Sequence, residues 1–190
     1  MRKETLLNRT ALFFAILAAF AVFTAAGEKC DYIEGTVIEQ GAALRTPARP
    51  LTICMKEYVT PEEMARFAEI FRQGGQKALE NAISKLEKGM VMIGASLGSP
   101  VGIIAKKTAE DGSTLYRILL DRRIAFGELW HGTRSLDYPF GLIEIKLGPD
   151  GKGQGIMLPA ARIELGPNGI TFENLDNLPW KLMNLRYKGR

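Results

Sequence analysis

The stretch that decides the fold is FGLIEIKLGPDGKGQGIMLPAARIELGPNGITFEN, residues 140–174. Within its first eight residues, Ile143 to Leu147 alternate between apolar and charged side chains, which is the period of a strand with one buried face. The pattern predicts an inward face of Ile143, Ile145 and Leu147 and an outward face of Glu144 and Lys146. The sequences GPDG and GPNG then predict turns, so that two further strands follow at 155–165 and 170–174. Short strands joined by tight turns pair antiparallel by default.

Strand patterns continue on both sides of this stretch. Glu110-Asp111-Gly112-Ser113 is a hairpin signal between two apolar runs. In the strand predicted at 51–59, Leu51, Ile53 and Met55 share one face and Cys54 lies on the other. The predicted strands are 32–39, 51–59, 90–95, 101–107, 115–121 and 180–187.

One segment has a helical period instead. Thr60 is a predicted N-cap, Pro61 suits the first helical position, and Glu63 completes a capping box. Gly74-Gly75 predicts a break or a bend, and Gly89 is the predicted end of the helical segment. We expect a helical hairpin or one bent helix over about 61–87, with an apolar stripe that packs on the sheet as a lid.

These elements predict an α+β fold in one domain, residues 27–190. The sheet is expected to be mainly antiparallel, with about seven to nine strands and the helical segment on one side. Meandering strands can close on themselves and remove their edges. The sheet is therefore expected either to curl into a partial barrel or to stay open in a two-layer arrangement.

Residues 1–26 have the pattern of an export signal. Basic residues precede the uncharged apolar run Ala11–Phe23, and Thr24-Ala25-Ala26 supplies small residues before a cut at Gly27. The alternatives are a retained membrane anchor and a lipid-modified Cys30, which lacks small residues directly before it. Cleavage predicts a periplasmic or secreted protein that keeps no stable membrane span.

The charge of the remaining chain excludes one class of function. The whole chain has 25 Lys and Arg against 21 Asp and Glu, and its formal net charge is +4. Without residues 1–26 the balance is 22 against 20, a net charge of +2. A near-neutral surface argues against a nucleic-acid binder. The late basic cluster Lys181, Arg186, Lys188 and Arg190 is interpreted as the solvated edge of a terminal strand.

Two cysteines, Cys30 and Cys54, lie in the exported part of the chain. Pairing is favoured in an oxidising compartment, so a structural disulfide is predicted. It would close a loop of about 25 residues, worth about 3 kcal/mol in the chain-entropy model. A redox role would favour a C-x-x-C pair, which the sequence lacks.

The connection Glu128–Pro139 holds the only histidine of the chain. His131, Arg134 and Asp137 are the candidate catalytic residues of a hydrolase, because they combine an imidazole with a guanidinium and a carboxylate. Trp130 and Tyr138 are the candidate ligand contacts, and a purely structural loop is the alternative. With one histidine and two cysteines expected to pair, we expect no metal site and no cofactor. GPDGKGQG is a hairpin turn and not a phosphate loop, because Gly153 follows Lys152.

The chain resembles a family of uncharacterised exported bacterial proteins over about Val59–Lys188. The resemblance is carried by SLDYPFGLIEI (135–145), GPDGKGQG (148–155), TPEE (60–63) and the segment 75–79. It implies export and a shared fold. The family has no established activity, so no residue role follows from it.

The leading functional hypothesis is an envelope protein that binds a small apolar ligand, a peptide or a protein partner without catalysis. A barrel mouth is a common ligand site. The alternatives are a hydrolase that uses the connection His131–Asp137 and a purely structural envelope or assembly factor.

Overall fold

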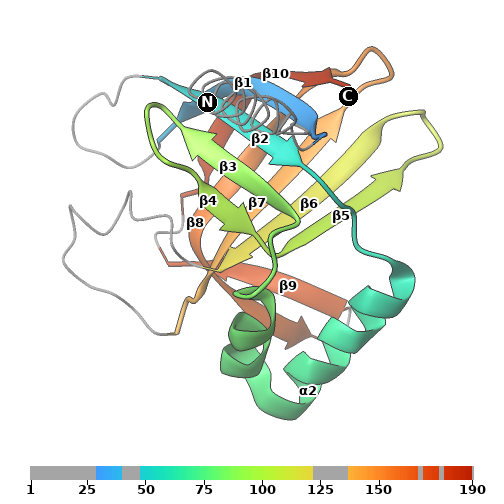
Figure 1. Cartoon of the computed structure of the whole chain (residues 1–190), viewed down its shortest axis with the longest axis vertical. Helices are drawn as coiled ribbons and strands as arrows, with labels where there is room; N and C mark the ends of the chain where they lie inside the picture. Colours follow the sequence, from blue (N-terminus) through green and yellow to red (C-terminus); the bar gives the residue numbers. More distant parts are fainter. Residues whose placement is uncertain (1–28, 40–47, 122–136, 167–168, 176–177, 190) are drawn as a thin grey trace, which may run out of the picture.

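The computed structural model describes residues 29–39, 48–121, 137–166, 169–175 and 178–189. Within these residues one helix accompanies ten antiparallel strands of a single sheet (Figure 1). The elements are β1 (Asp31–Ile38), β2 (Arg49–Met55), α2 (Pro61–Ile83), β3 (Gly89–Ile93), β4 (Ser99–Val101), β5 (Ile103–Thr108), β6 (Thr114–Asp121), β7 (Phe140–Leu147), β8 (Lys152–Gly166), β9 (Gly169–Asn174) and β10 (Trp180–Lys188). The predicted export signal lies outside the described residues.

The sheet curls into a nearly closed barrel. Its strand order is β4-β3-β2-β1-β10-β8-β7-β6-β5, so the two edge strands are consecutive in the chain. Only Gly102 separates β4 from β5, and its N–H donates to the carbonyl of Leu119 on β6 at 3.1 Å. The strand predicted at 101–107 is observed as β5, which pairs with β6, whereas Val101 ends the separate strand β4, which pairs with β3. Because β4 and β5 are the two edge strands and follow each other directly in the chain, the two edges of the sheet lie together.

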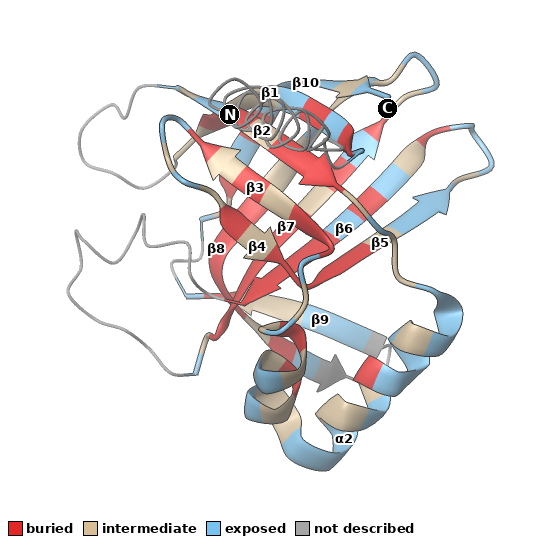
Figure 2. Ribbon diagram, viewed as in Figure 1, coloured by how far each residue is buried: buried red, intermediate tan, exposed pale blue. Residues whose placement is uncertain are grey.

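The barrel strands carry buried residues along much of their length (Figure 2). Most of their buried apolar side chains form one core cluster, which we call the barrel core. Ile143, Ile145 and Leu147 all belong to this barrel core, as their alternation predicts. Leu51, Ile53 and Met55 of β2 face the same core and are 0–1% exposed. Such complete burial is worth roughly 1.5–3 kcal/mol per large apolar side chain, so the barrel core is the main source of stability.

The helix begins where its sequence predicts. The Thr60 hydroxyl accepts a hydrogen bond from the Glu63 N–H, and the Glu63 carboxylate accepts one from the Thr60 N–H. Gly75 has φ 63° inside α2, so the segment is one bent helix. The helix ends at Ile83 with Ser84 as its C-cap, which corrects the predicted end at Gly89. Gly89 instead begins β3 and pairs with Met55.

Helix α2 covers the outer surface of the sheet at one end of the barrel, beside β9 (Figure 1). Its buried residues Phe67, Leu79 and Ile83 form a second core with outward-facing residues of the sheet. Gly102 allows the closest approach, since a Cβ there would lie 2.6 Å from the Cβ of Ile83. The sheet residues of this second core are Ile103, Leu119, Phe140, Leu142, Leu158, Ala161 and Ile163. The prediction of an apolar lid packed on the sheet is confirmed.

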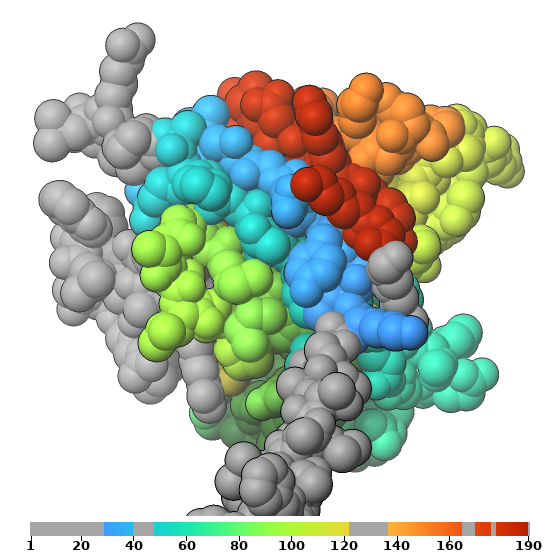
Figure 3. Space-filling model, turned by 45° about the horizontal axis from the view of Figure 1, so that its top comes forward, coloured from blue at the N-terminus to red at the C-terminus, as the bar shows by residue number. Residues whose placement is uncertain are grey.

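Strand β10 lies in the middle of the sheet, between β1 and β8 (Figure 3). The interpretation of Lys181, Arg186 and Lys188 as the edge of a terminal strand is therefore wrong. Both neighbours of β10 pair with it, and these side chains project from the outer surface. The sequence hides this because β1 is about 150 residues away in the chain, and pairing at such separation leaves no local signal.

The fold class is closer to mainly β than to the predicted α+β, because one helix accompanies ten strands in the described part of the chain. The expectation of a largely antiparallel, barrel-like sheet is confirmed, and the open two-layer alternative is not observed. The Cys30–Cys54 disulfide is present, with a Cα–Cα distance of 5.3 Å. Across the described ranges, no helix is long and apolar enough to cross a membrane.

Candidate functional site

The structure describes only part of the predicted site. Trp130, His131 and Arg134 fall within residues 122–136, outside the described residues, so the catalytic hypothesis stays a prediction. Asp137 and Tyr138 are described and lie directly before β7. Residues of α2, β8 and β9 surround these two side chains.

Tyr138 lies against Arg162 of β8. The Cζ atom of Arg162 is 5.4 Å from the centre of the Tyr138 ring, which is a cation–π distance. Arg162 also forms ion pairs with Glu164 at 2.7 Å and with Glu173 of β9 at 2.6 Å. Burial and the hydrogen bond to the Glu173 carboxylate raise the pKa of Tyr138 above its ordinary value. These groups are partly exposed, so they orient one another and add little stability.

A cleft of about 470 Å³ opens beside this cluster, and we call it the helix–strand cleft. One wall comes from α2 beyond the bend at Gly75, the other from β8, and the chain leading into β7 completes it. Its lining residues are Gln76, Lys77, Glu80, Asp137, Pro139, Arg162, Ile163 and Glu164. Of the predicted site residues, Asp137 lines the cleft, and Tyr138 stacks on its Arg162 wall.

At the edge of this cleft, a side-chain amide takes the place of a strand. The Nε2 group of Gln76 donates to the carbonyl of Ile163 at 2.5 Å, and the Ile163 N–H donates to Oε1 of Gln76 at 3.2 Å. A residue of a neighbouring strand makes the same pair of bonds in an antiparallel ladder. Gln76 therefore satisfies both backbone groups of Ile163.

The register explains why Ile163 needs this partner. Strand β7 begins at Phe140, which pairs with Ala161, so Ile163 lies beyond the end of β7. Strand β9 occupies the opposite edge, where the carbonyl of Ala160 accepts from the N–H of Leu175 at 2.9 Å. Backbone groups alternate between the two edges of a strand, so those of Ile163 point to the side that β7 has left.

A second polar cluster lies at the end of the barrel beside the disulfide. The hydroxyl of Tyr58 donates to Oδ2 of the buried Asp31 at 2.7 Å, and Tyr116 is only 4% exposed. The ammonium group of Lys106 lies 5.2 Å from the Tyr58 ring and 5.8 Å from the Tyr116 ring.

Burial keeps the two tyrosines of this cluster protonated at neutral pH. Burial, followed by the hydrogen bond to Asp31, raises the pKa of Tyr58 well above its ordinary value. Burial also raises the pKa of Tyr116, to about 12. A general base needs a pKa near the working pH, whereas these phenols stay protonated and serve as hydrogen-bond donors. The ring of Tyr58 packs against the barrel core, and Tyr116 is part of that core.

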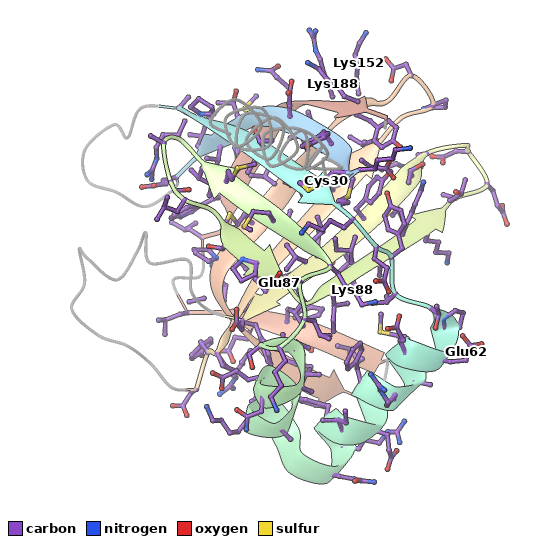
Figure 4. The ribbon with its side chains drawn as sticks, viewed as in Figure 1. Cys30, Glu62, Glu87, Lys88, Lys152 and Lys188 are labelled. Atoms are coloured by element: carbon purple, nitrogen blue, oxygen red, sulfur yellow. A yellow bond between two sulfur atoms is a disulfide. The ribbon has the colours of Figure 1, made fainter. Side chains whose placement is uncertain are left out.

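Lys88, Glu57 and Glu63 form a third cluster, which connects the start of α2 to the barrel. Figure 4 labels Lys88. Its side chain is 6% exposed, and its Nζ lies 2.5 Å from Glu57 and 2.9 Å from Glu63. Burial alone would lower the pKa of Lys88, but the hydrogen bonds and charges of the two glutamates raise it overall. Because Glu63 also caps the helix, this contact fixes the first turns of α2.

Sequence reasoning missed Gln76, Arg162 and Lys88. The bend at Gly74-Gly75 was visible, but nothing local marks the side chain after it as the partner of a strand 87 residues away. Of the residues that the structure describes, no group of three or more His, Cys, Asp or Glu side chains is placed to hold a metal ion.

No family model, curated protein or solved structure matches this chain. Inferences about its function therefore rest on the residues described above.

Proposed function

We propose that this protein is a binding module without catalytic activity, and that it accepts an extended peptide segment of a protein partner in the helix–strand cleft. The observation that carries the proposal is the pairing of Gln76 with both backbone groups of Ile163. An extended peptide offers the same donor and acceptor, and it would add a strand to β8 in place of the amide.

The exchange costs little. A neutral hydrogen bond contributes about 1 kcal/mol net, and the incoming peptide restores the two bonds that Gln76 loses. The bend at Gly75 supplies a hinge, while Lys88 holds the start of α2 in place. Affinity would come from peptide side chains that enter the cleft.

The charges of the cleft favour a basic peptide. Three carboxylates line it, those of Glu80, Asp137 and Glu164, against the two cations Lys77 and Arg162. Both cations already have carboxylate partners, Glu80 for Lys77 and Glu164 for Arg162. The charged side chains that line the cleft therefore sum to −1, which favours a lysine or arginine of the peptide over an acidic side chain. Electrostatic complementarity of this kind sets specificity.

The other hypotheses have less support. A small apolar ligand inside the barrel would have to displace the barrel core, whose members are mostly 0–3% exposed. The hydrolase hypothesis depends on His131, which lies outside the described residues. A purely structural factor needs no partner in the cleft, and the experiment below separates it from the proposal.

We also propose that the protein works outside the cytoplasm, in the periplasm or after secretion. The Cys30–Cys54 disulfide supports an oxidising compartment. Kinship with the exported family that the sequence resembles is a further proposal, and it implies the same location.

The test measures binding of a capped seven-residue peptide in which Lys and Val alternate, with an alternating Glu and Val peptide as its counterpart. The Lys peptide should bind more tightly and should shift the NMR signal of the Ile163 amide. Gln76→Ala removes the internal competitor, worth about 1–2 kcal/mol, so it should tighten binding by about 5- to 30-fold.

Gln73→Ala is the matched control, because Gln73 lies on the same helix and bonds only to Glu69 at the surface. It should leave the affinity unchanged. Equal binding of the two peptides, or no change in affinity on Gln76→Ala, would show that the amide is merely a structural cap.

A further inference from the structure

Strand β10 contains a bulge on the face of the barrel that carries many of its basic residues. Its register shifts against β8 between Leu182 and Leu185, so two residues, Met183 and Asn184, lie opposite the single Gln154. The register also shifts against β1. Asn184 has φ 55°, a left-handed conformation that no other non-glycine residue adopts in the described ranges. Bulges of this kind redirect side chains, and they are common beside functional sites.

The bulge borders a groove of about 580 Å³, which we call the bulge groove. Its charged lining residues are Lys146, Lys152 and Arg186, and no carboxylate lines it. Arg186 lies directly opposite Lys152 across the β8–β10 pair, and like charges in that arrangement are unfavourable. Lys152 and Lys188 both point away from the barrel at the top of Figure 4.

The carboxylates near the groove pair with its two lysines and, among the described residues, leave only Arg186 without an ion pair. Glu34 lies opposite Arg186 on the β1 side, but its ion pair is with Lys188, at 2.7 Å. Arg186 itself makes no ion pair with any residue that the structure describes. Lys146 pairs with Asp111 at 3.1 Å and Lys152 with Asp150 at 3.5 Å. Both pairs are well exposed, so they are weak and either lysine can turn to a ligand.

We propose that the bulge groove binds the diphosphate group of a small anionic molecule. Arginine offers a planar fork that suits phosphate oxygens, and lysine ammonium groups add point charges. Asn184 also lines the groove, and a side-chain amide can donate a further hydrogen bond. The three cations come from the neighbouring strands β7, β8 and β10, so they span about 10 Å. That span suits two linked phosphates better than one.

This site does not depend on the peptide proposal. Lys152 begins β8, whereas Ile163 lies near the other end of the same strand. The failure of either proposal would leave the other intact.

Isothermal titration of the full chain with inorganic pyrophosphate tests the proposal, with inorganic phosphate titrated at the same ionic strength. Pyrophosphate should bind at least 10-fold more tightly than phosphate. Arg186→Ala should weaken pyrophosphate binding at least 10-fold. In Asn184→Gly, the glycine tolerates the positive φ of this position, but the side-chain amide is lost. This variant should therefore weaken pyrophosphate binding about 3-fold.

Lys181→Ala is the matched control, because Lys181 is an exposed cation on the same strand and does not line the groove. It should change the affinity less than 2-fold. Equal affinity for the two anions, or an equal loss on Lys181→Ala and Arg186→Ala, would reduce the effect to general charge attraction and overturn the proposal.

Discussion

The two halves of β8 differ in the partners that form hydrogen bonds with the backbone along their edges. The first half, around Met157, pairs with β7 on one edge and with β10 on the other. The second half leaves the barrel, keeps β9 on one edge, and meets the Gln76 side chain on the other. The same strand thus has strand neighbours on both edges at one end, whereas at the other end a single side chain replaces one of them. This side chain is the partner that the proposed peptide would displace.

The largest difference between the two halves of β8 should be in the unfolding free energy that is lost when one side chain of each half is replaced by alanine. Met157 is completely buried in the barrel core, so Met157→Ala should cost about 3–4 kcal/mol of unfolding free energy through lost burial and a cavity. Arg162→Ala removes only partly exposed ion pairs and should cost less than about 1 kcal/mol. Urea denaturation of both variants would measure this. Equal losses would mean that the outer half is as tightly integrated as the barrel.

The disulfide should have the next largest effect. It joins residues 24 apart, so replacing Cys30 and Cys54 together by Ser should cost about 3 kcal/mol in the chain-entropy model. Because the bridge joins the residue before β1 to β2, away from the cleft residues, the loss should affect global unfolding and leave peptide binding in the cleft unchanged. A double variant that unfolds normally but no longer binds the peptide would contradict this separation.

Lys88 should contribute about 2 kcal/mol. Lys88→Met removes the cation between Glu57 and Glu63, but both carboxylates keep access to water, so the cost falls below the usual range for a fully buried pair. Lys85→Met is the control, since Lys85 is exposed on the same connection. If α2 is held as described, Lys88→Met should also loosen the first turns of the helix, which hydrogen exchange would detect.

The tyrosine cluster should make stability fall at alkaline pH. The pKa of Tyr116 is raised to about 12 in the folded protein, against an ordinary value of about 10. A raised pKa stabilises the fold fully below pH 10, and that contribution is lost as the pH rises toward 12. Thermal melting at stepped pH would measure the fall. Tyr58→Phe should cost about 1 kcal/mol at pH 7, because it removes the hydrogen bond to Asp31. It should also reduce the alkaline fall, because it removes a phenol whose pKa is raised in the folded protein.

Local patterns in the sequence predicted much of the barrel. The alternation at 140–147, the capping box at Thr60 and Glu63, and the pairing of Cys30 with Cys54 depend on neighbouring residues or on the redox compartment, and all three are observed. The closure through Gly102 and the central place of β10 depend on contacts between distant strands, which leave no periodic signal. The candidate site was predicted only at Asp137 and Tyr138, because its other members come from α2 and β8.

The most direct test is amide hydrogen exchange at Ile163, compared with Met157 in the same protein. If Gln76 is an exchangeable partner, the Ile163 amide should exchange much faster than that of Met157, and faster still in Gln76→Ala. The Lys and Val peptide should slow exchange at Ile163 and leave Met157 unchanged. An Ile163 amide as protected as Met157, and unaffected by the peptide, would contradict the division of β8 into a permanent half and an exchangeable half.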